Sequence, residues 1–284
     1  MLDRKLLLIS GKGGVGKSAV TASLALRASR LGKTVLAIGL VDGIGLAAHL
    51  GAEERSYEPH EVHPGIHTFT VDRARTLDEY LKIQLPVPRS APTRQLSRAL
   101  DVLVETAPGV REIVSMGKPI FEVWKASYDI VLVDAPPLGQ LLSYLRAPLT
   151  ISDLVSSGTI HHQAEEMRLT LADPEATGLL LVTTAEELPA LETTEALEVL
   201  GAEGLCVLAG LVVNRVLPPL DVVGDLAALP DGPHRAAAML HAGLHEDQDH
   251  WRSTLPDHDT LPFLFGVLTP GEVSARLADV WDES

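Results

Sequence analysis

The segment ISGKGGVGKS near the N-terminus contains two overlapping patterns that bind phosphate groups. Gly11, Gly13 and Gly16 match G-x-G-x-x-G, which is typical of loops that bind dinucleotides. The first and last of these glycines, with Lys17 and Ser18, also match G-x-x-x-x-G-K-[ST], which is typical of loops that bind nucleoside triphosphates. In both patterns the glycines let backbone N–H groups approach a phosphate at the N-terminus of a helix.

The two residues after the last glycine decide between these patterns. A dinucleotide presents a pyrophosphate and needs no lysine there. A triphosphate with Mg²⁺ gains from an ammonium at the β- and γ-phosphates and from a hydroxyl on the metal. Lys17 supplies the ammonium and Ser18 the hydroxyl. The segment therefore predicts a site for ATP and Mg²⁺, with Ser18 as a ligand of the metal.

The apolar runs of the chain predict the sheet that positions this loop. Residues 6–9 form a short apolar run that ends in the loop, as a strand buried on both faces would, and residues 18–31 have helical spacing. Further strands are expected at residues 34–40, 66–71, 129–133, 178–182, 207–213 and 261–265. A strand, a glycine turn, a helix and a strand form a βαβ unit. The predicted fold class is therefore α/β, with a doubly wound and mostly parallel sheet.

The length of 284 residues allows one large α/β domain or two smaller ones, and we expect a single domain over residues 1–284. Residues 73–126 predict a small helical insertion, interrupted by a proline-bearing joint at residues 86–92. Residues 227–259 are rich in Pro, His, Asp and Gly, and this composition predicts a loop-rich insertion.

Composition limits the partners. The formal charge of −15 argues against nucleic acid, which requires a clustered basic face, and against anchoring on anionic lipid. No apolar run has the length of a membrane-spanning helix or of a signal peptide, so we expect a cytoplasmic protein without stable membrane insertion. Cys206 is the one cysteine, lies in an apolar run, and is expected in the core.

A second lysine in the loop, Lys12, produces the sequence G-K-G-G-V-G-K-S, the deviant form of the Walker A motif. With this motif the chain resembles the dimeric P-loop ATPases that include the arsenical pump ATPase and the tail-anchored protein targeting factor, as a short bacterial member. In that family the counterpart of Lys12 reaches the nucleotide of the partner subunit. The resemblance therefore implies a homodimer, or a heterodimer with a homologous ATPase, in which Lys12 is catalytic.

Further motifs extend the resemblance along the chain. The segment D-A-P-P-L-G-Q from Asp134 is similar to the switch II sequence D-T-A-P-T-G-H, which implies that Asp134 stands behind Mg²⁺. The segment A-P-G-V-R-E from Ala107 is similar to A-P-G-x-x-E. Asn214 matches an asparagine that reads adenine, and Pro262 belongs to a loop that closes over the base. In the glycine loop the resemblance implies nucleotide contacts at Gly13, Gly14, Val15, Gly16, Lys17, Ser18 and Ala19.

The chain also departs from this family. Asp42 can take the place of the switch I aspartate that orients the attacking water, but the Pro-Ala-His that follows it in D-P-A-H-S-L is absent. Leu138 replaces the threonine of switch II. We expect an ATP-hydrolysing dimeric switch that acts on an unknown client. The alternative is a nucleotide-binding regulatory subunit, with weak or no hydrolysis, paired with an active homologous ATPase.

The chain lacks the residues that other activities of related ATPases require. Four methionines in the chain are too few for a soft groove that holds a transmembrane helix, and one cysteine cannot form a thiol cage for arsenite or share an iron–sulfur cluster. ATPases that position chromosomes or the septum rely on basic surfaces, which the acidic ending RLADVWDES does not supply. His241 and His245 have the spacing of metal ligands, but their acidic, polar surroundings favour a solvated helix face.

Overall fold

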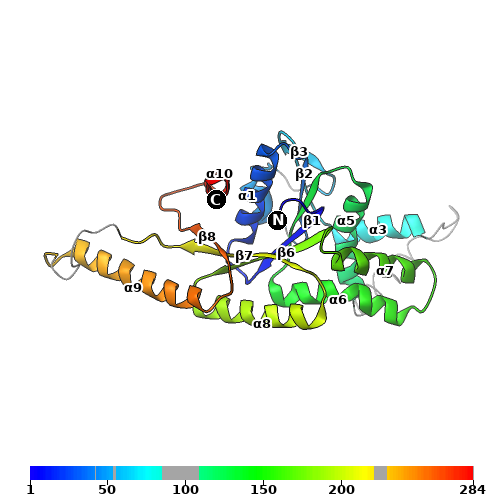
Figure 1. Ribbon diagram of the computed structural model, residues 1–284. Coiled ribbons are helices and arrows are strands. Elements are labelled where there is room, and N and C mark those ends of the chain that lie inside the picture. The colour runs from blue at the N-terminus through cyan, green and yellow to red at the C-terminus, as the bar shows by residue number, and fades with distance from the viewer. Residues whose placement is uncertain (42, 54–55, 85–108, 221–228, 284) are drawn as a thin grey trace.

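The computed structural model describes residues 1–41, 43–53, 56–84, 109–220 and 229–283. Its described strands form one eight-stranded sheet in the order β3-β4-β2-β5-β1-β6-β7-β8 (Figure 1). All neighbouring strands are parallel except β3, which pairs antiparallel with β4 at one edge. The strands are β1 (Leu6–Gly11), β2 (Val35–Gly39), β3 (His60–His63), β4 (Ile66–Thr70), β5 (Ile130–Asp134), β6 (Thr177–Thr184), β7 (Leu208–Val216) and β8 (Asp259–Pro262).

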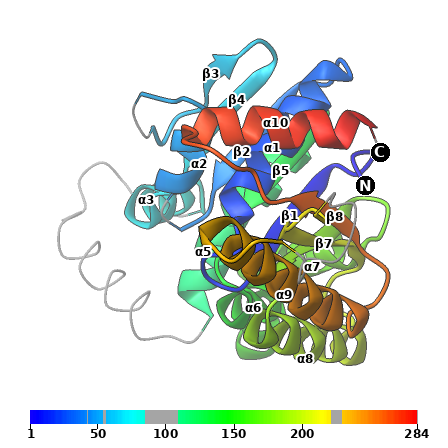
Figure 2. The same ribbon diagram turned by 90° about the vertical axis from the view of Figure 1, so that its left-hand side faces the viewer.

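Helices cover both faces of the sheet. The described helices are α1 (Lys17–Arg30), α2 (Ile44–His49), α3 (Arg73–Gln84), α5 (Val110–Lys125), α6 (Leu138–Leu154), α7 (Thr159–Ala172), α8 (Glu187–Glu203), α9 (Pro233–Ser253) and α10 (Pro270–Glu283). Helices α1, α2 and α10 pack together on one face, and α5, α6, α7 and α8 lie on the other (Figures 1 and 2). This arrangement is a three-layer α/β fold.

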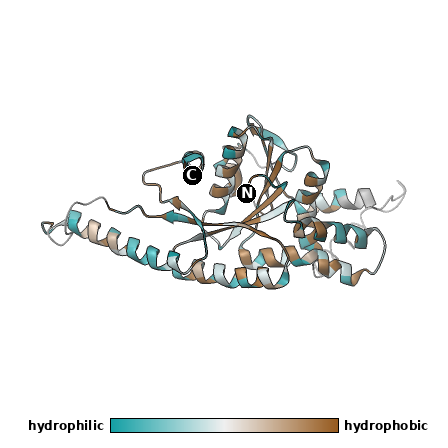
Figure 3. Cartoon of the chain, in the orientation of Figure 1, coloured by the Kyte–Doolittle hydropathy of each residue, from teal (hydrophilic) through white to brown (hydrophobic). Residues whose placement is uncertain are grey.

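The central strands divide the core into two apolar layers. Successive side chains of a strand point to opposite faces. Leu6 and Leu8 of β1 therefore pack with the layer under α5 to α8, whereas Leu7 and Ile9 pack with the layer under α1. All four side chains are fully buried, and the central strands are largely hydrophobic in Figure 3. This burial on both faces holds the carboxyl ends of β1, β5 and β6 rigidly at one edge.

The structure confirms the predicted fold class, and each of the seven predicted strands overlaps an observed one. The antiparallel strand β3 was not predicted. It is four residues long and alternates half-buried with exposed residues, so its apolar signal is weak. Within the predicted helical insertion, α3 and α5 are helical as expected, whereas the joint at residues 86–92 lies outside the described residues.

The prediction of a loop-rich insertion at residues 227–259 is wrong for most of that segment. Helix α9 spans 21 residues of it, begins after Gly232 with Pro233 in its first turn, and contains no buried residue. Figure 1 shows α9 extending away from the sheet, with its N-terminal end farthest out. Its His and Asp residues suit an exposed helix. A helix without a buried face has no periodic apolar pattern, so the polar composition of this segment suggested a loop.

No helix within the described residues combines the length and the apolar character that crossing a bilayer requires.

Candidate functional site

The loop between β1 and α1 is pressed against two neighbouring strands. A Cβ atom at Gly11 would lie 1.8 Å from the carbonyl oxygen of Val182 in β6, and one at Gly16 would lie 2.4 Å from Nδ2 of Asn214. Gly16 also has the left-handed φ of 96° directly before α1. By contrast, Gly13 and Gly14 are exposed, and nothing lies within 4 Å of an added Cβ. The loop is thus fixed at both ends and open in the middle, where a ligand would enter.

The N-terminus of α1 provides the electrostatics of an anion site. Its first turn contains no acidic residue, so no carboxylate in that turn competes with a phosphate for the backbone N–H groups and the positive end of the helix dipole. Lys17 Nζ donates a hydrogen bond to the carbonyl oxygen of Lys12 at 3.1 Å, which folds the side chain back over the loop. Burial lowers the pKa of Lys17, and the Asp134 carboxylate acts in the opposite direction. A phosphate group would therefore meet a half-buried ammonium already held over the loop.

Ser18 and Asp134 meet at the ends of two adjacent strands. β1 and β5 are paired with Ile9 opposite Asp134, and α1 starts just beyond the loop, so the two side chains reach each other. Ser18 Oγ donates a hydrogen bond to Asp134 Oδ2 at 2.6 Å. A hydroxyl backed by a carboxylate, both oxygen donors, fits Mg²⁺, which binds few protein ligands and retains water and phosphate oxygens. The structure thus brings the two residues predicted for the metal together, and their role as a metal site stays a prediction.

The segment in the switch I position approaches the same hydroxyl. A Cβ atom at Gly45, in the first turn of α2, would lie 2.7 Å from Ser18 Oγ. Gly43 has a φ of 66°, and its added Cβ would lie 2.1 Å from Thr70 Oγ1. Gly-Ile-Gly stands in place of Pro-Ala-His, and close packing leaves no room for a side chain at its two glycines, which the sequence pattern alone did not reveal. Asp42 lies outside the described residues, so its role stays a prediction.

Asn214 braces the glycine loop. It lies near the end of β7 and is only 4% exposed. Its Nδ2 donates to the carbonyl oxygen of Val15 at 2.8 Å, and its Oδ1 accepts from the backbone N–H of Arg215 at 2.9 Å. Both ends of the amide thus bind the backbone of this chain. The predicted contact with adenine stays a prediction, and the contact with the loop is one that sequence reasoning missed.

Pro262 ends the neighbouring strand β8 and leads into an exposed aromatic pair. Pro262 lies opposite Val216 of β7, and the N–H of Phe263 donates to the Val216 carbonyl oxygen at 2.8 Å. The rings of Phe263 and Phe265 are 5.0 Å apart, and both residues are exposed. The segment predicted to close over a base therefore begins at the end of β8, which pairs with β7, the strand that contains Asn214.

Lys12 reaches away from the loop toward α8. Its Nζ forms an ion pair with Glu192 Oε1 at 2.5 Å, and the two side chains are 29% and 47% exposed. The sequence contained no signal for this partner, because Glu192 is 180 residues away and lies among several other glutamates.

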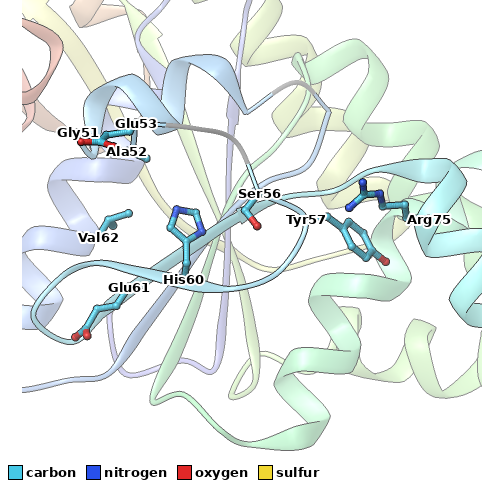
Figure 4. Close-up of a pocket in the computed structure, with 9 residues that line it drawn as sticks. All are labelled: Gly51, Ala52, Glu53, Ser56, Tyr57, His60, Glu61, Val62 and Arg75. Atoms are coloured by element: carbon cyan, nitrogen blue, oxygen red, sulfur yellow. The ribbon is translucent and has the colours of Figure 1, made fainter.

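An open hollow within the described residues lies elsewhere. It measures about 590 Å³ and is bordered by the end of α2, by β3 and by the start of α3 (Figure 4). Arg75 packs over the ring of Tyr57 there, and Glu61 accepts a hydrogen bond from the N–H of Gly65. None of the predicted site residues lines this hollow, so it is separate from the glycine loop.

Comparison with known proteins agrees with this geometry. Residues 4–158 match the family model described as anion-transporting ATPase. ATPase BagA of Mycobacterium tuberculosis is 29% identical over 255 residues, which cover 84% of this chain and 74% of that protein. ATPase get3 of Schizosaccharomyces japonicus is 27% identical over 150 residues, covering 52% of this chain and 45% of the relative.

A third relative, a putative arsenical pump-driving ATPase of Aquifex aeolicus, is 24% identical over 150 residues, covering 51% of this chain and 38% of its own length. The family match spans more than half of the chain and includes the glycine loop, Ser18 and Asp134. This chain therefore belongs to the anion-transporting ATPase family.

Proposed function

We propose that this protein is a Mg²⁺-dependent ATPase whose nucleotide state controls the arrangement of two subunits. The observation that carries the proposal is the contact between Ser18 and Asp134 beside the Lys17 ammonium, at the open glycine loop. A family of proteins named ATPases supports hydrolysis in general. The client stays unknown, and the acidic, low-cysteine composition favours a cytoplasmic protein that binds neither nucleic acid nor a membrane.

Each residue of the loop has a separate role in the proposed binding of ATP. The N–H groups of Gly13, Gly14 and Gly16 surround the phosphates, and Lys17 offsets the charge of the β- and γ-phosphates. Ser18 holds Mg²⁺, and Asp134 orients the hydroxyl from behind. When bound, Mg²⁺ neutralises charge that develops on the phosphate oxygens.

Two further residues complete the catalytic proposal. Asp42 orients a water molecule in line with the γ-phosphate, and Lys12 acts on the nucleotide of the partner subunit. Asp42 follows Val41 at the carboxyl end of β2, which pairs with β5, the strand that carries Asp134. Because both strands end at the same edge, this part of the chain leads toward the metal side of the site.

The alternative function is a regulatory subunit that binds nucleotide with weak or no hydrolysis. Leu138 favours it, because this side chain is buried in the apolar layer at the start of α6, where the switch II pattern that the segment resembles has a threonine. Such a subunit would keep the phosphate contacts of the loop and would pair with an active homologous ATPase.

Arsenite is not a proposed substrate. Cys206 is the one thiol in the chain and lies buried under the sheet. Burial raises its pKa to about 12, so the thiol stays protonated and is a poor ligand for a soft cation.

ATP turnover by the purified protein, with Mg²⁺ and after chelation with EDTA, separates the two functions. The enzyme hydrolyses ATP alone and loses this activity with EDTA. A regulatory subunit binds the nucleotide without turnover until a homologous ATPase is added. Light scattering with a non-hydrolysable analogue should show a dimer. A monomer in every nucleotide state, without a homologous partner, would leave only the heterodimer.

A further inference from the structure

We propose that Glu192 is a positioning residue that keeps Lys12 on its own subunit until the nucleotide of a second copy of this chain competes for it. The inference rests on the proposed function, in which Lys12 acts across the subunit interface. Its basis is the ion pair between Lys12 Nζ and Glu192 Oε1 at 2.5 Å. Glu192 would thereby set the concentration at which nucleotide-bound subunits associate.

The backbone on the Lys12 side of this pair is firmly placed. Lys12 directly follows Gly11, which is paired with Val182 of β6. The Val182 carbonyl oxygen lies so close to the Gly11 α-carbon that a Cβ atom would not fit there. The chain leaves β6 two residues later and enters α8 at Glu187. The loop and α8 therefore emerge from adjacent parallel strands at the same edge of the sheet.

The Glu192 side is equally constrained. On α8, Ala190, Thr193 and Ala196 are buried against the sheet, and the Thr193 hydroxyl donates to the Pro189 carbonyl oxygen at 2.7 Å. This anchoring leaves the Glu192 side chain on the outer surface of the helix. The pair therefore joins two segments whose backbones are held in place by adjacent strands of the sheet.

The surroundings of Glu192 suit a surface that becomes covered. Leu188 and Leu191 lie one turn before and directly before Glu192, and they are 62% and 48% exposed. Covering the two leucines would remove apolar area from water and favour association, while the half-exposed Glu192 carboxylate beside them stays in contact with water. A triphosphate on the partner would offer Lys12 more negative charge than one carboxylate, whereas Glu192 could return to water. Lys12 would therefore exchange partners only when nucleotide is present.

The expected size of the effect follows from the exposure of the pair. Ion pairs that are partly open to water contribute little, so breaking this one should favour association about threefold to fivefold per subunit. A symmetric dimer releases two such pairs, which corresponds to about ninefold to twenty-fivefold in the dimerisation constant.

The test is sedimentation of the wild type and Glu192→Gln with Mg²⁺ and a non-hydrolysable ATP analogue over a range of protein concentrations. Glu192→Gln keeps the size of the side chain and should dimerise at lower concentration. Glu195→Gln removes the same charge one turn farther along α8 and should behave as the wild type. In a Lys12→Ala background, Glu192→Gln should have no further effect, because the lysine on which it acts is gone.

A second measurement needs no nucleotide. Acetic anhydride should modify the Lys12 amine faster in Glu192→Gln than in the wild type or in Glu195→Gln, as followed by mass spectrometry. The inference would be overturned, and the proposed function left standing, if Glu192→Gln dimerised at the same protein concentration as the wild type. The same holds if Glu192→Gln still shifted that concentration in the Lys12→Ala background. If neither the wild type nor Glu192→Gln associates with the analogue, the proposed homodimeric switch fails, and the inference fails with it.

Discussion

The loop after β1 and the helix α9 differ in how strongly the rest of the molecule constrains them. Gly11 and Gly16 leave no room for a single added methyl group, and Asn214 holds the loop through a buried hydrogen bond. Helix α9 is 21 residues long and has no buried residue. The comparison shows that a sequence pattern is informative where the backbone geometry tolerates few residue types. Composition misleads where a helix has no fully buried residue.

The largest expected effect is on ATP binding, at the constrained loop after β1. Lys17→Ala should reduce ATP binding below detection by calorimetry, because the triphosphate loses the cation held over the loop. Lys33→Ala is the matched control, since Lys33 lies after α1 and pairs with Asp3 at 3.9 Å. Wild-type affinity in Lys17→Ala would show that the glycine loop is not the triphosphate site.

The next effect separates catalysis from binding within the same site. Asp42→Asn should bind MgATP nearly as well as the wild type, because binding uses the loop and the metal. Its turnover should fall about a hundredfold, the low end for losing a group that activates water. Steady-state turnover and calorimetry measure the two quantities. Equal turnover in the variant and the wild type would remove Asp42 from the mechanism.

A smaller effect tests the constraint on the loop itself. Gly11→Ala should destabilise the fold by about 2 kcal/mol and lower Tm by roughly 4–8 °C, because the new methyl group must displace the β6 backbone. Gly13→Ala should leave Tm unchanged, since nothing lies within 4 Å of its added Cβ. Thermal unfolding followed by circular dichroism compares them. An equal Tm in both variants would mean that the contact with Val182 is not limiting.

The smallest expected effect is in α9. Ala237→Gly weakens an exposed helical position by about 1 kcal/mol, but this cost should stay local because Ala237 is exposed and no residue of α9 is fully buried. Hydrogen exchange should increase within residues 233–253 while Tm and ATP binding stay unchanged. Ala22→Gly in α1 is the counterpart, and it should lower Tm because Ala22 is fully buried. A comparable loss of Tm in Ala237→Gly would show that α9 is coupled to the core.

Much of the candidate site could be read from local sequence, because its chemistry depends on neighbours along the chain. Lys17 and Ser18 follow the glycines directly, and a buried apolar strand precedes them. The amino-acid sequence by itself thus indicated the glycine loop between a strand and a helix, the mostly parallel sheet, and Ser18 and Asp134 as candidates for one metal site. These features repeat short-range patterns that few residue types can satisfy.

Only the tertiary structure decided which distant residues meet the loop. The contacts of Lys12 with Glu192, Val15 with Asn214, and Ser18 with Gly45 depend on the order and register of the strands. Likewise, only the structure shows that residues 233–253 form the helix α9. No local pattern encodes these features, because the distance between remote residues is set by how the sheet assembles, and an exposed helix lacks the buried stripe that would mark it.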